Sequence, residues 1–208
     1  MCARYTMLGA GQGLELPLPP DAKPRYNIAP SVLVPVVVWE GDKFVARYMI
    51  WGMRPEWAKS LLINARAETA LEKPTFRNAL RERRCLVVAS GFFEWQDLGS
   101  EKIPYHFICP GRTVFGFAGV WTPSPQHEYP ECVIMTTMPN ALVAPIHDRM
   151  PSILTDEDYQ RYLTTDDPRE AQAIAMSPYR SESMDSYMVT RKVGNPRFDD
   201  PEAVARLA

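Results

Sequence analysis

The sequence has few cysteines, few histidines and no long apolar run. Its 208 residues include four cysteines and three histidines. No two cysteines form a CxxC pair and the histidines lie far apart, so we expect no metal, no cofactor and no disulfide framework. The longest strongly apolar stretch, VLVPVVVW, is far too short to span a bilayer, and no charged-then-apolar leader opens the chain. We therefore expect a cytoplasmic protein with no membrane partner.

An excess of charge of one sign is also missing. The net charge is −2 at pH 7, which argues against indiscriminate binding to nucleic acids. Residues 1–149 nevertheless hold 16 Lys and Arg against 14 Asp and Glu, whereas residues 150–208 hold 7 against 11. An anionic ligand would accordingly bind in a local basic patch of the first part.

Proline, in contrast, is abundant: 20 residues, roughly twice the usual share of about 5%. So many prolines exclude long helices over much of the chain and favour short strands joined by turns. The pattern predicts one α+β domain over residues 1–208, with a mostly antiparallel, barrel-like or two-sheet β core and peripheral helices. Strands are expected at 31–40 and 43–52 (a hairpin), and at 85–96, 104–111, 113–121, 131–138 and 185–193.

Helices are expected in three places. Residues 64–84 have the most helical composition, with Pro74 dividing them and Thr75 capping the second half. Residues 155–163 follow a cap at Thr155, and residues 166–176 contain a proline near their start.

Cys2 stands directly behind the initiator methionine. Methionine aminopeptidases trim Met when the next side chain is small, and trimming would leave an α-amine and a thiol two carbons apart. No internal residue can supply that pair. The plainer alternative is that a cysteine at position two is an accident of the start site.

Further polar residues stand in contexts that suit chemistry. Asn64 and Arg66 are two residues apart and share a face if their segment is extended. Glu94 lies in an aromatic strand, where burial would raise the pKa of its carboxyl towards neutrality and make it a useful acid or base. His147 and Arg149 stand on a short loop between two prolines.

Each of these residues also has a purely structural interpretation. Asn64 could cap a turn, Arg66 could pair with Glu68, Glu94 could form a salt bridge at a sheet edge, and His147 could be an ordinary loop histidine. Short motifs carry a high rate of false positives, and spacing alone does not bring these residues together.

Seven motifs in order across residues 1–151 closely resemble the SRAP family, the SOS response-associated peptidase-like or abasic-site processing proteins. These motifs are MCARY, RYNIAP, WGMRPEW, INARAET, GFFEW, IMTT and IHDRMP. The family usually has Gly where this chain has Ala3, and residues beyond 151 match weakly apart from VGN at 193–195.

The resemblance implies a protein that binds single-stranded DNA and captures abasic sites as a thiazolidine on the N-terminal Cys2. It implies Asn64, Glu94 and His147 as the supporting catalytic residues. It also implies DNA contacts, by phosphate-binding arginines and by tryptophans, at Arg4, Arg66, Arg149, Trp51 and Trp57.

Two other classes of function stay open at this point. An N-terminal nucleophile assisted by Glu and His also fits a thiol autopeptidase that removes its own leader. A passive single-stranded DNA-binding module, in which Cys2 is incidental, is the third possibility. In each case we expect a monomer, associated with the nucleoid if the source is bacterial.

Overall fold

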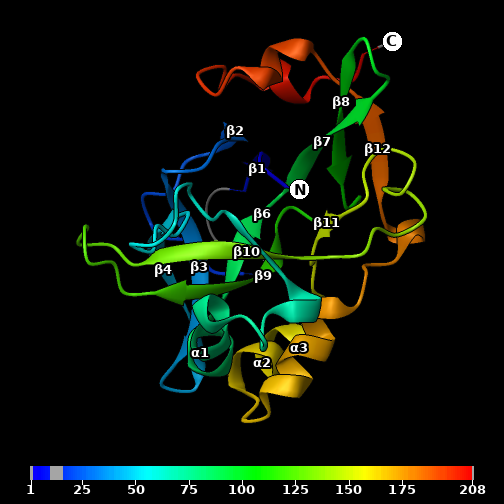
Figure 1. The fold of residues 1–208 in the computed structure, drawn as a ribbon. Helices are drawn as coiled ribbons and strands as arrows, with labels where there is room; N and C mark the ends of the chain where they lie inside the picture. Colours follow the sequence, from blue (N-terminus) through cyan, green and yellow to red (C-terminus); the bar gives the residue numbers. More distant parts are fainter. Residues whose placement is uncertain (1, 10–15, 208) are drawn as a thin grey trace.

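Two β-sheets and three short α-helices make up residues 2–9 and 16–207, which the computed structural model describes (Figure 1). This arrangement confirms the predicted α+β class. The smaller sheet has five strands, in the spatial order β12 (Asp185–Met188), β8 (Lys102–Ile108), β7 (Gly91–Asp97), β1 (Tyr5–Met7) and β2 (Arg25–Ile28).

The larger sheet closes into a barrel, which confirms the barrel-like core. Its path runs in the order β11 (Met150–Pro151), β10 (Glu131–Thr137), β4 (Lys43–Trp51), β3 (Leu33–Glu40), β6 (Arg84–Ala89) and β9 (Phe115–Thr122). Because β9 also pairs with β10, the ring is complete and leaves neither of these strands as an edge. A short strand, β5 (Asn64–Arg66), adds to β10 in parallel.

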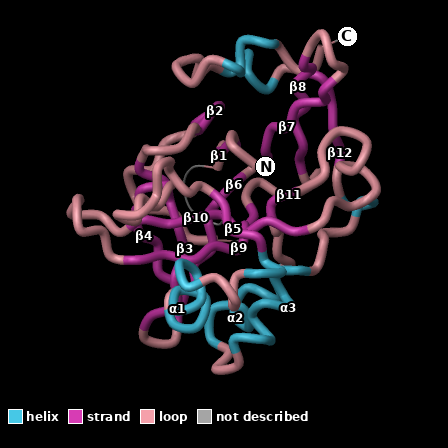
Figure 2. Tube along the Cα trace, viewed as in Figure 1, coloured by secondary structure: helices cyan, strands magenta, loops and turns pink. Residues whose placement is uncertain are grey.

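The three helices gather at one end of the barrel (Figure 2). They are α1 (Pro74–Glu82), α2 (Asp156–Thr164) and α3 (Pro168–Met176). Proline occupies the first turn of α1 and α3, where its missing N–H is not needed, and Thr155 precedes α2 as predicted. None of the described helices has the length and apolar character needed to cross a membrane.

The predicted helix over residues 64–84 is wrong in its first half. Residues 64–66 form β5 instead, paired with residues 134–136 of β10, and a 3₁₀ turn follows at Ala67–Thr69. Burial of Ala65 and Ala67 and pairing with β10 outweigh the helix-favouring composition of this segment, because tertiary contacts override intrinsic propensity. The expected cap at Thr75 is also wrong, because Pro74 starts the helix and Lys73 takes the cap position.

The predicted hairpin of β3 and β4 is confirmed. Its turn places Gly41 and Asp42 at φ of 54° and 61°, and Glu40 pairs with Lys43. Both central residues are therefore left-handed, as in a type I′ turn, which suits glycine and is tolerated by aspartate.

The run predicted as one strand at 85–96 divides at Ser90, where the chain leaves the barrel and enters the smaller sheet. Ser90 donates its N–H to the carbonyl of Thr6 (2.7 Å) and its hydroxyl to the carbonyl of Thr113 (2.7 Å). The next residue, Gly91, must be a glycine, because a Cβ there would lie 2.4 Å from Nε2 of His106. β6 and β7 thus belong to different sheets.

Arg84 joins two helices to the barrel from a buried position. Its guanidinium donates to the carbonyls of Leu80 and Arg81 at the end of α1, and to those of Leu163 and Thr165 at the end of α2. The last carbonyls of a helix lack partners within the helix, so one cation satisfies both ends.

His106 is buried in the smaller sheet and held neutral. Its Nε2 lies 3.2 Å from the Thr6 hydroxyl and its Nδ1 lies 3.0 Å from the Tyr187 hydroxyl, which itself donates to the carbonyl of Val204 (3.1 Å). Burial lowers the pKa of His106 from 6.5 to about 3.

The free energy of unfolding should consequently fall as the pH drops below about 6.5. Between that value and about 3, the unfolded chain binds a proton on His106 that the folded protein excludes. At pH 4 the loss should be about 3 kcal/mol relative to pH 8, with no contribution from this group above pH 7. Denaturant melts at several pH values would measure it. A His106→Gln variant should lose this part of the pH dependence, and an unchanged dependence in that variant would contradict the assignment.

Candidate functional site

The N-terminal segment is fixed in place by backbone pairing with β7. Tyr5 pairs with Phe92, and the N–H of Phe93 donates to the carbonyl of Arg4 at 3.0 Å. Since the strands are antiparallel, Cys2 is carried towards the part of β7 that holds Glu94. Cys2 is fully buried, and burial raises the pKa of its thiol well above the usual range, with the Glu94 carboxylate raising it further.

Asn64 reaches the same place from the barrel. Its Nδ2 donates to the carbonyl of Cys2 at 2.8 Å. Its Oδ1 is buried and has no hydrogen-bond partner within residues 2–9 and 16–207. Because a buried acceptor without a partner is costly, this atom is suited to a donor that arrives with a ligand.

Glu94 and His147 face each other beside Cys2. Oε2 of Glu94 lies 3.9 Å from Nε2 of His147, and only 3% of Glu94 is exposed. Burial raises the pKa of the Glu94 carboxyl, and the nearby imidazole offsets part of that rise. The raised pKa that was expected for Glu94 from its aromatic sequence context is thus confirmed.

The imidazole of His147 has two alternative partners at Nδ1. This atom lies 3.0 Å from the backbone N–H of Arg149 and 3.0 Å from Oδ1 of Asp148. It can accept from the first only when unprotonated and donate to the second only when protonated. Both protonation states therefore find a partner, as a group that relays protons requires.

Glu94 and His147 open onto a pocket of about 360 Å³, lined also by Trp95, Lys102 and Gly194. Its volume lies within the range of small-ligand sites, roughly 300 to 1,000 Å³. The lining of the pocket therefore combines titratable side chains with one aromatic residue and one glycine.

Gly194 belongs to a C-terminal strap (residues 189–204), which crosses the smaller sheet (Figure 1). Asn27, fully buried, donates Nδ2 to the carbonyls of Val193, Asn195 and Phe198. The strap is thereby tied to β2 at three successive points.

Arg4 adds to the same attachment. Its guanidinium donates to Oδ1 of Asn27 (3.1 Å) and to the carbonyls of Val193 (2.7 Å) and Gly194 (3.1 Å). Arg4 stands two residues from Cys2 and thus links the N-terminal segment to the strap residue that lines the pocket. The sequence analysis missed Asn27 in this role, although the RYNIAP motif contains it.

The other two predicted arginines differ in their surroundings. Arg149 is buried, forms a bidentate pair with Glu68 (2.7 and 2.8 Å) and donates to the carbonyl of Thr136. Arg66 is exposed and makes no side-chain hydrogen bond or ion pair in the described part of the chain. Glu68 therefore pairs with Arg149 and not with Arg66, and its role was missed because the two residues are 81 positions apart.

The two predicted tryptophans also differ in their exposure to solvent. Trp51 is fully buried, its indole N–H donates to the carbonyl of Ile63 (2.9 Å) and its ring packs edge-on against Tyr5. A base cannot stack on a ring that is covered on both faces, so the structure corrects the expected stacking role of Trp51. Trp57 is 68% exposed and available for such a contact.

The structure thus brings together Cys2, Asn64, Glu94 and His147, which spacing alone did not. No group of three or more His, Cys, Asp or Glu residues is arranged to hold a metal ion in the part of the chain that the structure describes. The other three cysteines are buried and free.

Comparison with known proteins identifies the family of this chain. Residues 1–196 match the family described as SOS response associated peptidase (SRAP). The abasic site processing protein YoqW of Bacillus subtilis is 36% identical, over 98% of this chain and 99% of its own. The abasic site processing protein YedK of Escherichia coli is 30% identical, over 91% of this chain and 88% of its own.

A solved structure of a protein from Bacteroides thetaiotaomicron has the same fold, with a TM-score of 0.73 and 29% identity over 86% of this chain and 82% of that one. The family match over residues 1–196 includes Cys2, Asn64, Glu94 and His147. The chain belongs to the SOS response associated peptidase (SRAP) family.

Proposed function

We propose that this protein binds single-stranded DNA and joins Cys2 covalently to the opened sugar of an abasic site as a thiazolidine. The proposal depends on the contacts that bring Asn64 and Glu94 to Cys2, and on the approach of His147 to Glu94. The names of the relatives, abasic site processing proteins, support the choice of ligand. Met1, whose removal frees the amine of Cys2, lies outside the described residues.

The reaction forms two bonds to one carbon. The free amine, with a usual pKa of about 7.7–8.0, attacks the aldehyde carbon of the opened sugar, and loss of water gives an imine. The thiol sulfur then adds to the imine carbon while its proton ends on the nitrogen. Closure of the five-membered ring is fast because both nucleophiles share one carbon skeleton. Trapping by sulfur competes with strand scission, which an open imine would permit.

Glu94 is the group that transfers protons in this reaction. The Cys2 thiol keeps its proton near neutral pH because burial raises its pKa, so sulfur attack needs a neighbouring base. Glu94, whose own pKa is raised by burial, can take the proton from the amine or thiol and return it to the departing water.

His147 and Asn64 assist the sugar. His147, at the pocket side of Glu94, would protonate the ring oxygen and so promote opening of the closed sugar. Asn64 holds the carbonyl of Cys2 with its Nδ2 and leaves Oδ1 to accept from a sugar hydroxyl or the amine.

Contacts to DNA outside the reacting sugar would come from Arg66 and Trp57. Arg66 is exposed without a described side-chain partner, and guanidinium suits phosphate. Trp57 offers a stacking surface for a base. For Arg4 and Arg149, whose donors are occupied by protein acceptors, we propose a positioning role beside any phosphate contact.

The covalent step predicts a denaturation-resistant complex. Methionine-trimmed protein incubated with an abasic single strand should give a shifted band on a denaturing gel, and Cys2→Ala should give none. Cys2→Ser keeps the amine but lacks the sulfur, so its adduct should be largely lost on denaturation. A full-strength band with Cys2→Ala, or with protein that retains Met1, would refute the proposal.

The autopeptidase alternative is separated by intact mass. If Glu94 and His147 remove Met1, then Glu94→Gln and His147→Ala should retain it; if a host aminopeptidase does so, both variants should lose it as the wild type does.

Non-covalent binding should depend steeply on salt. If Arg66 neutralises a phosphate, Arg66→Ala should reduce the slope of log K against log salt by about 0.7 for a single strand. Titrations by fluorescence anisotropy would measure the slope. Arg77→Ala, on the exposed face of α1, is the matched control and should leave it unchanged. Equal slopes in wild type and Arg66→Ala would remove Arg66 from the interface.

Loss of the strap attachment should slow the chemistry more than the binding. Asn27→Ala removes the amide donor from three strap carbonyls and leaves Arg4 as the remaining side-chain donor to the strap beside Gly194, so that Gly194 is held less firmly. Cross-linking should slow by roughly tenfold or more, because small misplacements of reacting groups are costly, while affinity for an undamaged strand changes little. Lys192→Ala, which removes a surface pair with Glu202 and a contact over the Phe198 ring but leaves the hydrogen bonds from Asn27 in place, is the control. A wild-type cross-linking rate in Asn27→Ala would disprove the positioning role.

A further inference from the structure

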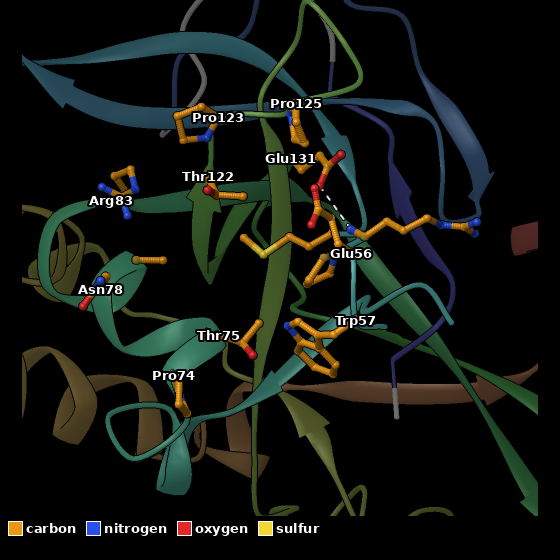
Figure 3. Close-up of a pocket in the computed structure, with 14 residues that line it drawn as sticks. Glu56, Trp57, Pro74, Thr75, Asn78, Arg83, Thr122, Pro123, Pro125 and Glu131 are labelled. Carbon is orange, nitrogen blue, oxygen red and sulfur yellow. Dashed lines mark hydrogen bonds between the residues drawn. The ribbon is translucent and has the colours of Figure 1, made fainter. Parts of the chain in front are cut away.

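A second pocket lies away from Cys2, between α1, the segment after β4 and the loop from β9 to β10 (Figure 3). Its volume is about 380 Å³. The described side chains that line it do not include Cys2, Asn64, Glu94 or His147. It is therefore separate from the covalent chemistry and has no role in it.

One end of this pocket offers a flat apolar surface. The indole of Trp57 and the side chain of Thr75 stand next to each other there (Figure 3). Trp57 is 68% exposed, which is unusual for the largest apolar side chain and has no explanation in packing. Met53, Ala79 and Pro123 extend the apolar lining. A flat aromatic ligand fits such a wall, and stacking on an indole favours nucleobases.

The buried polar group of the pocket is an acceptor. Glu131, only 4% exposed, accepts from the backbone N–H of Arg54 at Oε2 (3.1 Å) and from the Ser124 hydroxyl at Oε1 (2.8 Å). Each carboxylate oxygen has two lone pairs, so each can accept one more hydrogen bond. Two adjacent acceptors match a ligand with two adjacent N–H donors.

Guanine is the base with that pattern. Its Watson–Crick edge carries a ring N–H beside an amino group, whereas adenine and cytosine carry one amino group and thymine flanks a single N–H with two carbonyls. Arg54 and Arg83 also line the pocket and suit the phosphates of a nucleotide, although Arg83 pairs with Glu82 (2.9 Å) and Glu56 adds a carboxylate. The Asn78 amide and the Thr75 hydroxyl have no hydrogen-bond partner among the described residues and add adaptable contacts.

The pocket and the Cys2 site lie along one strand of the barrel. Glu131 begins β10, and Ile134, three residues later, pairs with Asn64. Three residues of strand span about 10 Å. A bound single strand commonly contacts a protein over roughly four or more nucleotides, so it can reach both places.

We propose that this pocket holds a guanine of the same DNA strand, a few nucleotides from the abasic site, and gives the protein a sequence preference. This inference rests on the proposed function, since it takes the strand as the ligand. Trp57 stacks on the base, Glu131 accepts its two N–H groups, and Arg54 and Arg83 attract the flanking phosphates.

The test uses non-covalent binding only. Labelled oligothymidines with one tetrahydrofuran abasic analogue, which has no aldehyde, carry a single guanine at each position in turn, and anisotropy gives Kd. We expect about tenfold tighter binding for guanine at one position near the lesion, compared with the all-thymine strand. Equal Kd at every position would overturn the proposal. So would free guanosine monophosphate that competes as well as the guanine-containing strand.

Variants test the assigned contacts. Glu131→Gln places an amide N–H₂ in the pocket and should abolish the guanine preference, and the exposed Trp57→Ala should do the same. Glu128→Gln, in the same loop but outside the pocket, should retain it. A full guanine preference in folded Glu131→Gln or in Trp57→Ala would also refute the proposal.

A parallel assay distinguishes a failure of this inference from a failure of the proposed function. The same strands with a true abasic site are assayed for the covalent band. A band without a guanine preference would refute the pocket and leave the function standing. A guanine preference without any band would refute the covalent function while the pocket's base recognition stood.

Discussion

The antiparallel pairing of β1 with β7 is the constraint on which the candidate site depends. It is only a few hydrogen bonds long, yet it sets where the amino end of the chain lies. A reactive group on a free terminus would otherwise sample many positions, at a large entropic cost for each productive encounter. Pairing with the strand that carries Glu94 removes that freedom before any ligand arrives.

Burial then determines the acid–base behaviour of the paired groups. Both the Cys2 thiol and the Glu94 carboxyl have raised pKa values because each loses hydration, and the Glu94 carboxylate further disfavours charge on the Cys2 thiol. Such a site stays largely uncharged at rest and becomes reactive through proton transfers within it. Under the proposed function, burial would keep the Cys2 thiol unreactive until a neighbouring group takes its proton.

Part of the fold and of the candidate site could be predicted from the sequence, for reasons that differ from residue to residue. The hairpin at Gly41 depends on local geometry, so pattern alone was enough, whereas the strand at Asn64–Arg66 depends on pairing with β10 and was predicted as helix. The burial of Trp51 and the use of Arg149 by Glu68 depend on partners far away in the chain. No local pattern carries that information, because exposure is a property of the folded sheet and not of the residue type.

The order of the chain has a consequence for synthesis. Cys2 is among the first residues to be made, whereas Gly194, which lines the pocket of Glu94 and His147, and Phe198, to which Asn27 donates, come near the end. Under the proposed function, the aminothiol of a nascent chain would lack this enclosure for most of translation. Full reactivity would then be delayed until nearly the whole polypeptide has been made.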